Sequence, residues 1–214
     1  MIDLPTGVVD GVLIDLVLDL YHDRGQWDGV YPSDIGYKVL QRRGEVSIVV
    51  CRGSTTLPDW IENFIDVPVY VPGLGRVEKG FLDGAMAFFD AVRHEVAPPI
   101  VVTGHSRGAA VADILAAKLL LEFGTGVWSV TFAKPRPGFA SLSALLARRA
   151  RWYRNRKDPV TFVPYLFGEY QHPGDLVLLD VPPPAGDPWG PLAEHHSELY
   201  AAGVHALAHQ EAVA

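Results

Sequence analysis

A serine stands between two glycines in the segment Gly104-His105-Ser106-Arg107-Gly108. An apolar run typical of a buried strand, residues 99–103, precedes this segment, and a helix-forming stretch, residues 109–118, follows it. Glycines permit a sharp turn between such a strand and such a helix, so the serine hydroxyl would stand above a sheet edge at a helix N-terminus. This placement suits a nucleophile, and Ser106 is the candidate.

A serine hydroxyl is a weak nucleophile at neutral pH. It needs a histidine to accept its proton and a carboxylate to orient that histidine. After a Gly-x-Ser-x-Gly turn of the α/β-hydrolase kind, both partners lie downstream, in the order acid, then histidine. Asp158 directly follows a predicted strand and is the best candidate acid, whereas Asp175 and Asp180 are weaker candidates. The histidine is one of a group near the C-terminus: His195, His196, His205 and His209.

Two hydrogen-bond donors are needed for the oxyanion that forms when a serine attacks an ester. One is expected to be the backbone N–H of Arg107, the residue after the nucleophile. The other must come from a second loop. Ser54 follows an apolar strand and a glycine, so it can donate through its N–H and its hydroxyl, although Arg-Gly-Ser after a strand is also typical of a simple turn.

Strand and helix patterns alternate around the serine. An amphipathic helix is expected near residues 8–20, and two hairpins are expected, one joining 36–40 to 45–50 and one joining 169–172 to 176–180. Between the hairpins, strands are predicted at 99–103, 127–132 and 151–155, and helices at 81–96, 109–123 and 141–149. This alternation predicts an α/β fold with a mainly parallel central sheet and helices on both faces.

In their order and spacing, several motifs resemble the class 3 lipases, the fungal triacylglycerol lipases and their plant and bacterial relatives. The resemblance runs from about Val46 to Tyr200, and its motifs are Arg52-Gly53-Ser54 with Asp59-Trp60, residues 77–82, residues 104–108, residues 131–138, residues 155–160, residues 170–174 and His196 before Tyr200. It implies an α/β-hydrolase fold. It also implies the roles of the site residues: Ser106 as nucleophile, Asp158 as acid, His196 as base, and Ser54 with Arg107 as oxyanion hole.

The choice of His196 over His195 rests on that resemblance, because the family motif has its histidine shortly before a tyrosine, here Tyr200. His205 and His209 are spaced like metal ligands, but no Glu-x-x-His pattern accompanies them. A solvated helix face explains them better. We expect no metal and, because no glycine-rich phosphate loop is present, no cofactor.

Apolar side chains recur at helical spacing within residues 55–66: Leu57, Trp60, Ile61, Phe64 and Ile65. The resemblance implies that this segment is a lid, which covers the catalytic serine in water and turns its apolar face toward lipid at an interface. The alternative is a helix packed permanently on the core, which is what such a stripe most often means.

Composition sets the remaining limits. A chain of 214 residues with 49% hydrophobic residues predicts one domain, residues 1–214. A net charge of −7 argues against a nucleic-acid partner. Cys51 is the only cysteine, so no intramolecular disulfide forms, and with neither a signal peptide nor a transmembrane segment visible we expect a cytoplasmic protein. Secretion with a removed leader is the alternative.

These observations predict a serine carboxylic-ester hydrolase that acts on acylglycerols or other lipid esters through an acyl-enzyme. Its partners would be a small-molecule ester or lipid substrate and, transiently, a lipid interface. A short-chain or aryl esterase without interfacial activation is one alternative. A non-catalytic binding protein on a hydrolase scaffold is another, since fold alone does not exclude it.

Overall fold

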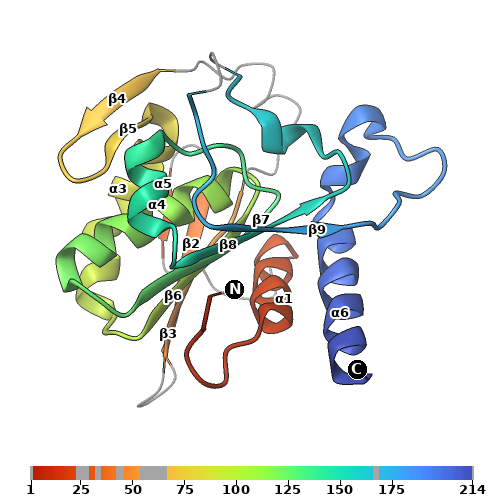
Figure 1. Ribbon diagram of the computed structural model, residues 1–214, viewed down its shortest axis with the longest axis horizontal. Coiled ribbons are helices and arrows are strands. Elements are labelled where there is room, and N and C mark those ends of the chain that lie inside the picture. The colour runs from red at the N-terminus through yellow and green to blue at the C-terminus, as the bar shows by residue number, and fades with distance from the viewer. Residues whose placement is uncertain are drawn as a thin grey trace.

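The computed structural model describes residues 2–22, 29–31, 35–41, 46–53, 67–165 and 169–213 (Figure 1). Seven strands form one sheet in the order β1-β2-β3-β6-β7-β8-β9: Gly29–Tyr31, Ile35–Gln41, Ser47–Cys51, Ile100–His105, Val127–Phe132, Ala150–Asn155 and Asp175–Leu179. A separate two-stranded sheet consists of β4 (Pro68–Val71) and β5 (Gly75–Glu78). The helices are α1 (Asp10–Tyr21), α3 (Lys79–Glu95), α4 (Arg107–Phe123), α5 (Ala140–Leu146) and α6 (Ser197–Val213).

Within the seven-stranded sheet, neighbouring strands from β3 through β6, β7 and β8 to β9 pair in parallel, whereas β1 pairs with β2 and β2 with β3 in antiparallel fashion at one edge. The first predicted hairpin is confirmed, since β2 pairs with β3 and Val39 lies opposite Val49. Helices α4 and α5 connect successive parallel strands, as parallel pairs require. The predicted α/β fold with a mainly parallel sheet is therefore confirmed.

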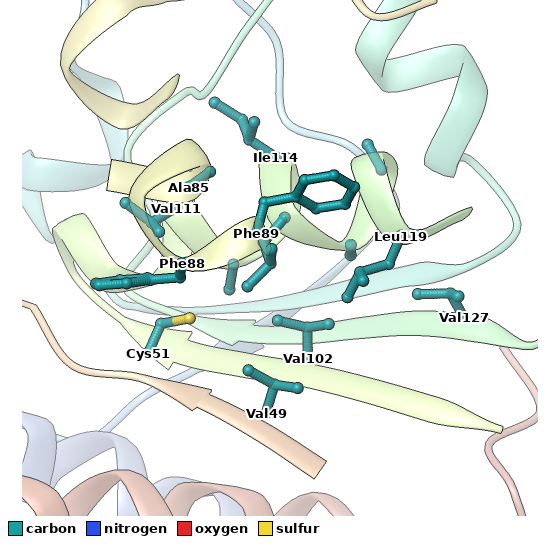
Figure 2. Packing of buried hydrophobic residues seen from close by; sticks show 14 of the residues in the cluster. Val49, Cys51, Ala85, Phe88, Phe89, Val102, Val111, Ile114, Leu119 and Val127 are labelled. Atoms are coloured by element: carbon teal, nitrogen blue, oxygen red, sulfur yellow. The ribbon is translucent and has the colours of Figure 1, made fainter. Parts of the chain in front are cut away.

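Both faces of the sheet are covered by helices. On one face, Phe88 of α3 and Ile114 of α4 pack with Val49 and Val102 in a buried cluster (Figure 2). On the other face, Leu13 of α1 and Tyr200 of α6 belong to a second cluster, which includes Val101. Neighbouring residues of a strand point to opposite faces, so Val101 and Val102 belong to different clusters. In Figure 1 the same division places α1 and α6 apart from α3, α4 and α5.

The second predicted hairpin is wrong. Strand β9 pairs in parallel with β8, with Trp152 opposite Leu176, whereas Gln171 forms an isolated bridge with Gly138. Gly174 turns the chain onto the start of β8: its φ is +81°, in the left-handed region that favours glycine, and a Cβ there would lie 2.0 Å from the Ala150 carbonyl oxygen. A strand that extends the main sheet gains a partner that the local hairpin pattern cannot reveal.

A buried ion pair joins α4 to the loop after β7. Lys134 Nζ lies 2.5 Å from Asp113 Oδ2, and both side chains are fully buried. Asp113 Oδ1 accepts a hydrogen bond from Ser129 Oγ at 2.6 Å, and Lys134 Nζ also donates to the Pro173 carbonyl at 3.1 Å. These contacts connect α4, β7 and the turn before β9.

None of the helices in the described part of the chain is long and apolar enough to cross a membrane.

Removing one member of the Asp113–Lys134 pair leaves the other buried without its partner. We expect Asp113→Ala or Lys134→Met alone to lower the free energy of unfolding by about 3–5 kcal/mol, measured by urea denaturation. The double variant Asp113→Ala with Lys134→Met should lose much less than the two single losses together. A double variant whose loss equals that sum would contradict the coupling.

Candidate active site

Ser106 lies at the turn between β6 and α4, with φ 57° and ψ −134°, a conformation that costs a non-glycine residue about 1–3 kcal/mol. Its N–H donates to the Phe132 carbonyl at 3.0 Å, which anchors the turn to β7. A Cβ on Gly104 or Gly108 would lie 2.6 Å or 2.5 Å from the Cys51 carbonyl oxygen. Both glycines are therefore needed for the turn to approach the end of β3 this closely.

Asp158 and His195 form a buried pair beside this turn. Asp158 follows β8 and precedes the short 3₁₀ helix η1 (Pro159–Phe162), and His195 ends the 3₁₀ helix η3 (Gly190–His195). His195 Nδ1 lies 2.7 Å from Asp158 Oδ2, and the two side chains are 1% and 0% exposed. An ionised carboxylate can only accept, so in the neutral ring Nδ1 carries the proton and Nε2 has the lone pair.

The Asp158 carboxylate is held by further donors. Oδ1 accepts from the Val160 N–H at 3.0 Å, and Oδ2 accepts from the Tyr200 hydroxyl at 2.6 Å. The same hydroxyl accepts from the Asn155 N–H at 3.0 Å. Burial and the nearby Asp158 charge raise the pKa of Tyr200 well above its ordinary value, so Tyr200 remains a donor. The orientation of the acid is thus determined by α6 and by its own loop.

In the described part of the chain Asp158 pairs with His195 and not with His196, which differs by one residue from the expected pairing. The Nε2 of His196 lies 3.2 Å from Asp187 and its ring packs on Trp189 with 3.8 Å between centroids. Neighbouring residues at the junction of η3 and α6 direct their side chains differently, so only His195 reaches the acid. Tyr200, which served as the marker for the histidine, does contact Asp158. The histidine that pairs with Asp158 therefore lies one residue further from Tyr200 than the motif suggested.

His105 holds the backbone of His195. Its Nε2 donates to the His195 carbonyl at 3.1 Å, and its Nδ1 accepts from the Tyr21 hydroxyl at 3.1 Å. Burial lowers the pKa of His105 well below its ordinary value, which keeps the ring neutral with this tautomer. No role of His105 is predicted from the sequence, although its position directly before Ser106 is a signal that the sequence contains.

Two buried polar atoms in the site have no hydrogen-bond partner within the described part of the chain, Ser106 Oγ and His195 Nε2. The segments that carry these atoms are in contact, since the ring of His105, which directly precedes Ser106, lies 4.8 Å from the ring of His195 between centroids. A hydroxyl that can donate a proton and a ring nitrogen that can accept one are thus both without a partner in the described residues.

The expected oxyanion donors are described only in part. Arg107 is the first residue of α4, so its N–H belongs to the positive end of that helix. Ser54 lies outside the described residues, but Gly53 packs on the turn, since a Cβ there would be 2.7 Å from the His105 carbonyl oxygen. The predicted lid residues Leu57, Trp60, Ile61, Phe64 and Ile65 also lie outside the described residues.

Where the chain is described, no three histidine, cysteine, aspartate or glutamate side chains gather in a way that could hold a metal ion.

The fold and the site together are those of an α/β-hydrolase with serine, histidine and aspartate at the carboxyl edge of its sheet. More particularly, the chain belongs to the class 3 lipases: the sequence model of that family, described as "Lipase (class 3)", matches residues 48–168.

Curated relatives include the chloroplastic phospholipase A(1) DAD1 of Arabidopsis thaliana, 28% identical over 64% of this chain and 40% of its own. The lipase of Rhizomucor miehei is 27% identical over 59% of this chain and 40% of its own. The secreted mono- and diacylglycerol lipase A of Penicillium camembertii is 27% identical over 68% of this chain and 52% of its own. This chain thus spans about half or less of the length of these relatives.

Solved structures with the same fold include a mutant of MDLA from Penicillium cyclopium, with a TM-score of 0.64, 23% identity and coverage of 74% of this chain and 64% of that chain. The native propeptide complex of Rhizomucor miehei lipase has a TM-score of 0.64, with 20% identity over 79% and 65%.

His172 makes stability depend on pH. Its Nε2 donates to the Thr161 carbonyl at 2.8 Å, and its ring stacks on Trp152 at 3.8 Å between centroids. Burial, with the nearby Lys134 charge, lowers the pKa of His172 from 6.5 to about 2. In the unfolded chain the ring takes up a proton near pH 6.5, whereas in the folded chain it stays neutral. The neutral, buried His172 ring therefore adds its full contribution to stability above about pH 6.5, and this contribution declines as the pH falls below 6.5.

We therefore expect the free energy of unfolding to fall as pH drops from 6 to 4, by about 1.4 kcal/mol per pH unit for each histidine kept neutral. His172→Gln should reduce this slope by about one proton, measured by urea denaturation at several pH values. His94→Gln, at an exposed helix position, is the control and should not change the slope. An unchanged slope in His172→Gln would contradict the assignment.

Proposed function

We propose that this protein is a serine carboxylic-ester hydrolase, a lipase that cleaves acylglycerols or other lipid esters through an acyl-enzyme on Ser106. The observation that carries the proposal is the buried His195–Asp158 pair beside the strained Ser106 turn, in a chain of the class 3 lipase family. The names of several relatives support the substrate class, since they are lipases of mono- and diacylglycerols.

In the first half of the reaction, His195 Nε2 accepts the Ser106 hydroxyl proton while Oγ attacks the ester carbonyl carbon. Asp158 stabilises the imidazolium that forms, because its negatively charged Oδ2 already accepts a hydrogen bond from the Nδ1–H group. The Arg107 N–H, with Ser54, stabilises the oxyanion of the tetrahedral intermediate. Collapse of this intermediate releases the alcohol, which takes the proton from Nε2.

In the second half, water replaces the alcohol. His195 Nε2 accepts a proton from this water, and the resulting hydroxide attacks the acyl carbon on Ser106. The fatty acid leaves and Ser106 recovers its proton from His195. The neutral His105, which holds the His195 carbonyl, helps keep the ring in place through both halves.

Replacement of the proposed nucleophile and the proposed base tests the proposal. We expect Ser106→Ala and His195→Ala each to lower kcat for a p-nitrophenyl ester by about 10³-fold or more, and the double variant to lose no more than either, because the triad acts as a unit. A fluorophosphonate should label the native chain once, at Ser106.

His196→Ala is the matched control and should retain most activity, since His196 pairs with Asp187 instead. Full activity of Ser106→Ala would rule out the proposed nucleophile. Loss confined to His196→Ala would return the base to that residue.

The finer proposal is contact with a lipid interface through the predicted lid, residues 55–66. Activity on a long-chain ester should then rise steeply once the substrate exceeds its solubility, and Trp60→Ala should weaken this rise while sparing a short soluble ester. A profile over p-nitrophenyl esters of increasing chain length separates the lipase from the short-chain esterase. Equal responses to both substrates would count against the lid, as would unfolding of Trp60→Ala, which would make the stripe part of the core.

The setting of the protein is also proposed. The relatives from Penicillium and Malassezia are named as secreted lipases, which supports the secretion alternative. The cytoplasmic expectation gains no support from them.

A further inference from the structure

The position of His195 depends on how its segment is held against the loop that carries Asp158. Glu194 directly precedes His195 and reaches across to that loop. Its Oε2 accepts from the Lys157 N–H at 2.8 Å, and its Oε1 accepts from Arg156 Nε at 3.0 Å. One carboxylate next to the histidine therefore binds the two residues that precede the acid.

The loop that Glu194 binds is strained. Arg156 has φ 45°, in the left-handed region that an arginine rarely adopts, and its N–H donates to the Leu179 carbonyl at 2.9 Å. Such a conformation persists only where surrounding contacts hold it. The Glu194 carboxylate is one of these contacts, and it acts immediately before Asp158.

A second contact joins the same two segments. Asn155 Nδ2 donates to the Glu194 carbonyl at 3.3 Å and to the Val181 carbonyl at 2.9 Å. On its other side, the histidine segment is held by His105, which donates to the His195 carbonyl. Glu194 and His195 are thus bound both by the loop of the acid and by the turn of the nucleophile.

We propose that Glu194 is a positioning residue, which keeps the His195 ring in register with Asp158 by binding the Lys157 N–H. This inference rests on the proposed roles of His195 and Asp158. The ion pair with Arg156 contributes less to this positioning than the hydrogen bond does. The side chains of Glu194 and Arg156 are 22% and 39% exposed, and exposed ion pairs contribute little. The hydrogen bond to the backbone carries the role, so a neutral amide that can accept it should suffice.

The test compares Glu194→Ala with Glu194→Gln, and uses Asp180→Ala as the matched control. Asp180 is the other carboxylate on Arg156, at 3.0 Å, and its side chain is 89% exposed. The measurements are kcat and KM on a short soluble ester, the thermal midpoint, and the far-downfield proton resonance of His195 Nδ1–H. That resonance reports the pairing with Asp158 without any turnover.

We expect Glu194→Ala to lower kcat by up to about 10²-fold, as small misplacements of catalytic groups do, with KM little changed and the Nδ1 proton resonance weakened or shifted. Glu194→Gln should recover most of kcat and the resonance. Asp180→Ala should have the kcat and the Nδ1 proton resonance of the native protein. If Glu194→Ala does not fold, Glu194→Asp, whose side chain is one methylene shorter, should show the same loss of kcat.

Native kcat and an unchanged resonance in Glu194→Ala would overturn the proposal, as would a Glu194→Gln variant that falls as far as Glu194→Ala. A lower thermal midpoint with unchanged kcat would mean that Glu194 only stabilises the fold. Failure of the catalytic proposal itself would show differently, as continued turnover by His195→Ala.

Discussion

The hydrogen bond between His195 Nδ1 and Asp158 Oδ2 is the interaction on which the rest of the site depends. It determines which nitrogen of the neutral ring carries the proton, and it leaves the other nitrogen with a lone pair, as the proposed role of a base requires. Because both groups are buried, an unpaired charge there would be costly, and the surrounding donors on Asp158 are what make the buried carboxylate tolerable. Tyr200 and the Val160 N–H thus hold the Asp158 carboxylate in place and satisfy its oxygens.

The central sheet brings Ser106 close to the Asp158–His195 pair. Ser106 and Asp158 follow β6 and β8, which are separated by β7, and the parallel direction of the strands brings both to the same edge. Two apolar clusters hold α3 and α4 on one face and α1 and α6 on the other. Helix α6 has two tasks, since it buries Tyr200 in the core and directs its hydroxyl to the acid.

Much of this arrangement could be predicted from local patterns. The strand, glycine turn and helix around Ser106 are contiguous in sequence, and so are the first hairpin and the amphipathic helix α1. The second hairpin was wrong because β9 takes its partner from β8, which is remote from the turn that suggested it. The roles of His105, Asn155 and Glu194 also come from contacts between segments far apart in the chain.

The sequence by itself determined the glycine turn at Ser106, the alternation that makes a parallel sheet, and the position of Asp158 after β8, because each depends on neighbouring residues and their backbone preferences. Only the tertiary structure decided which of two adjacent histidines meets Asp158. That choice depends on how the end of η3 lies against the Asp158 loop, where Asn155 binds the Glu194 carbonyl and His105 binds the His195 carbonyl. Side chains one residue apart point in different directions, so a small difference in approach exchanges the two histidines.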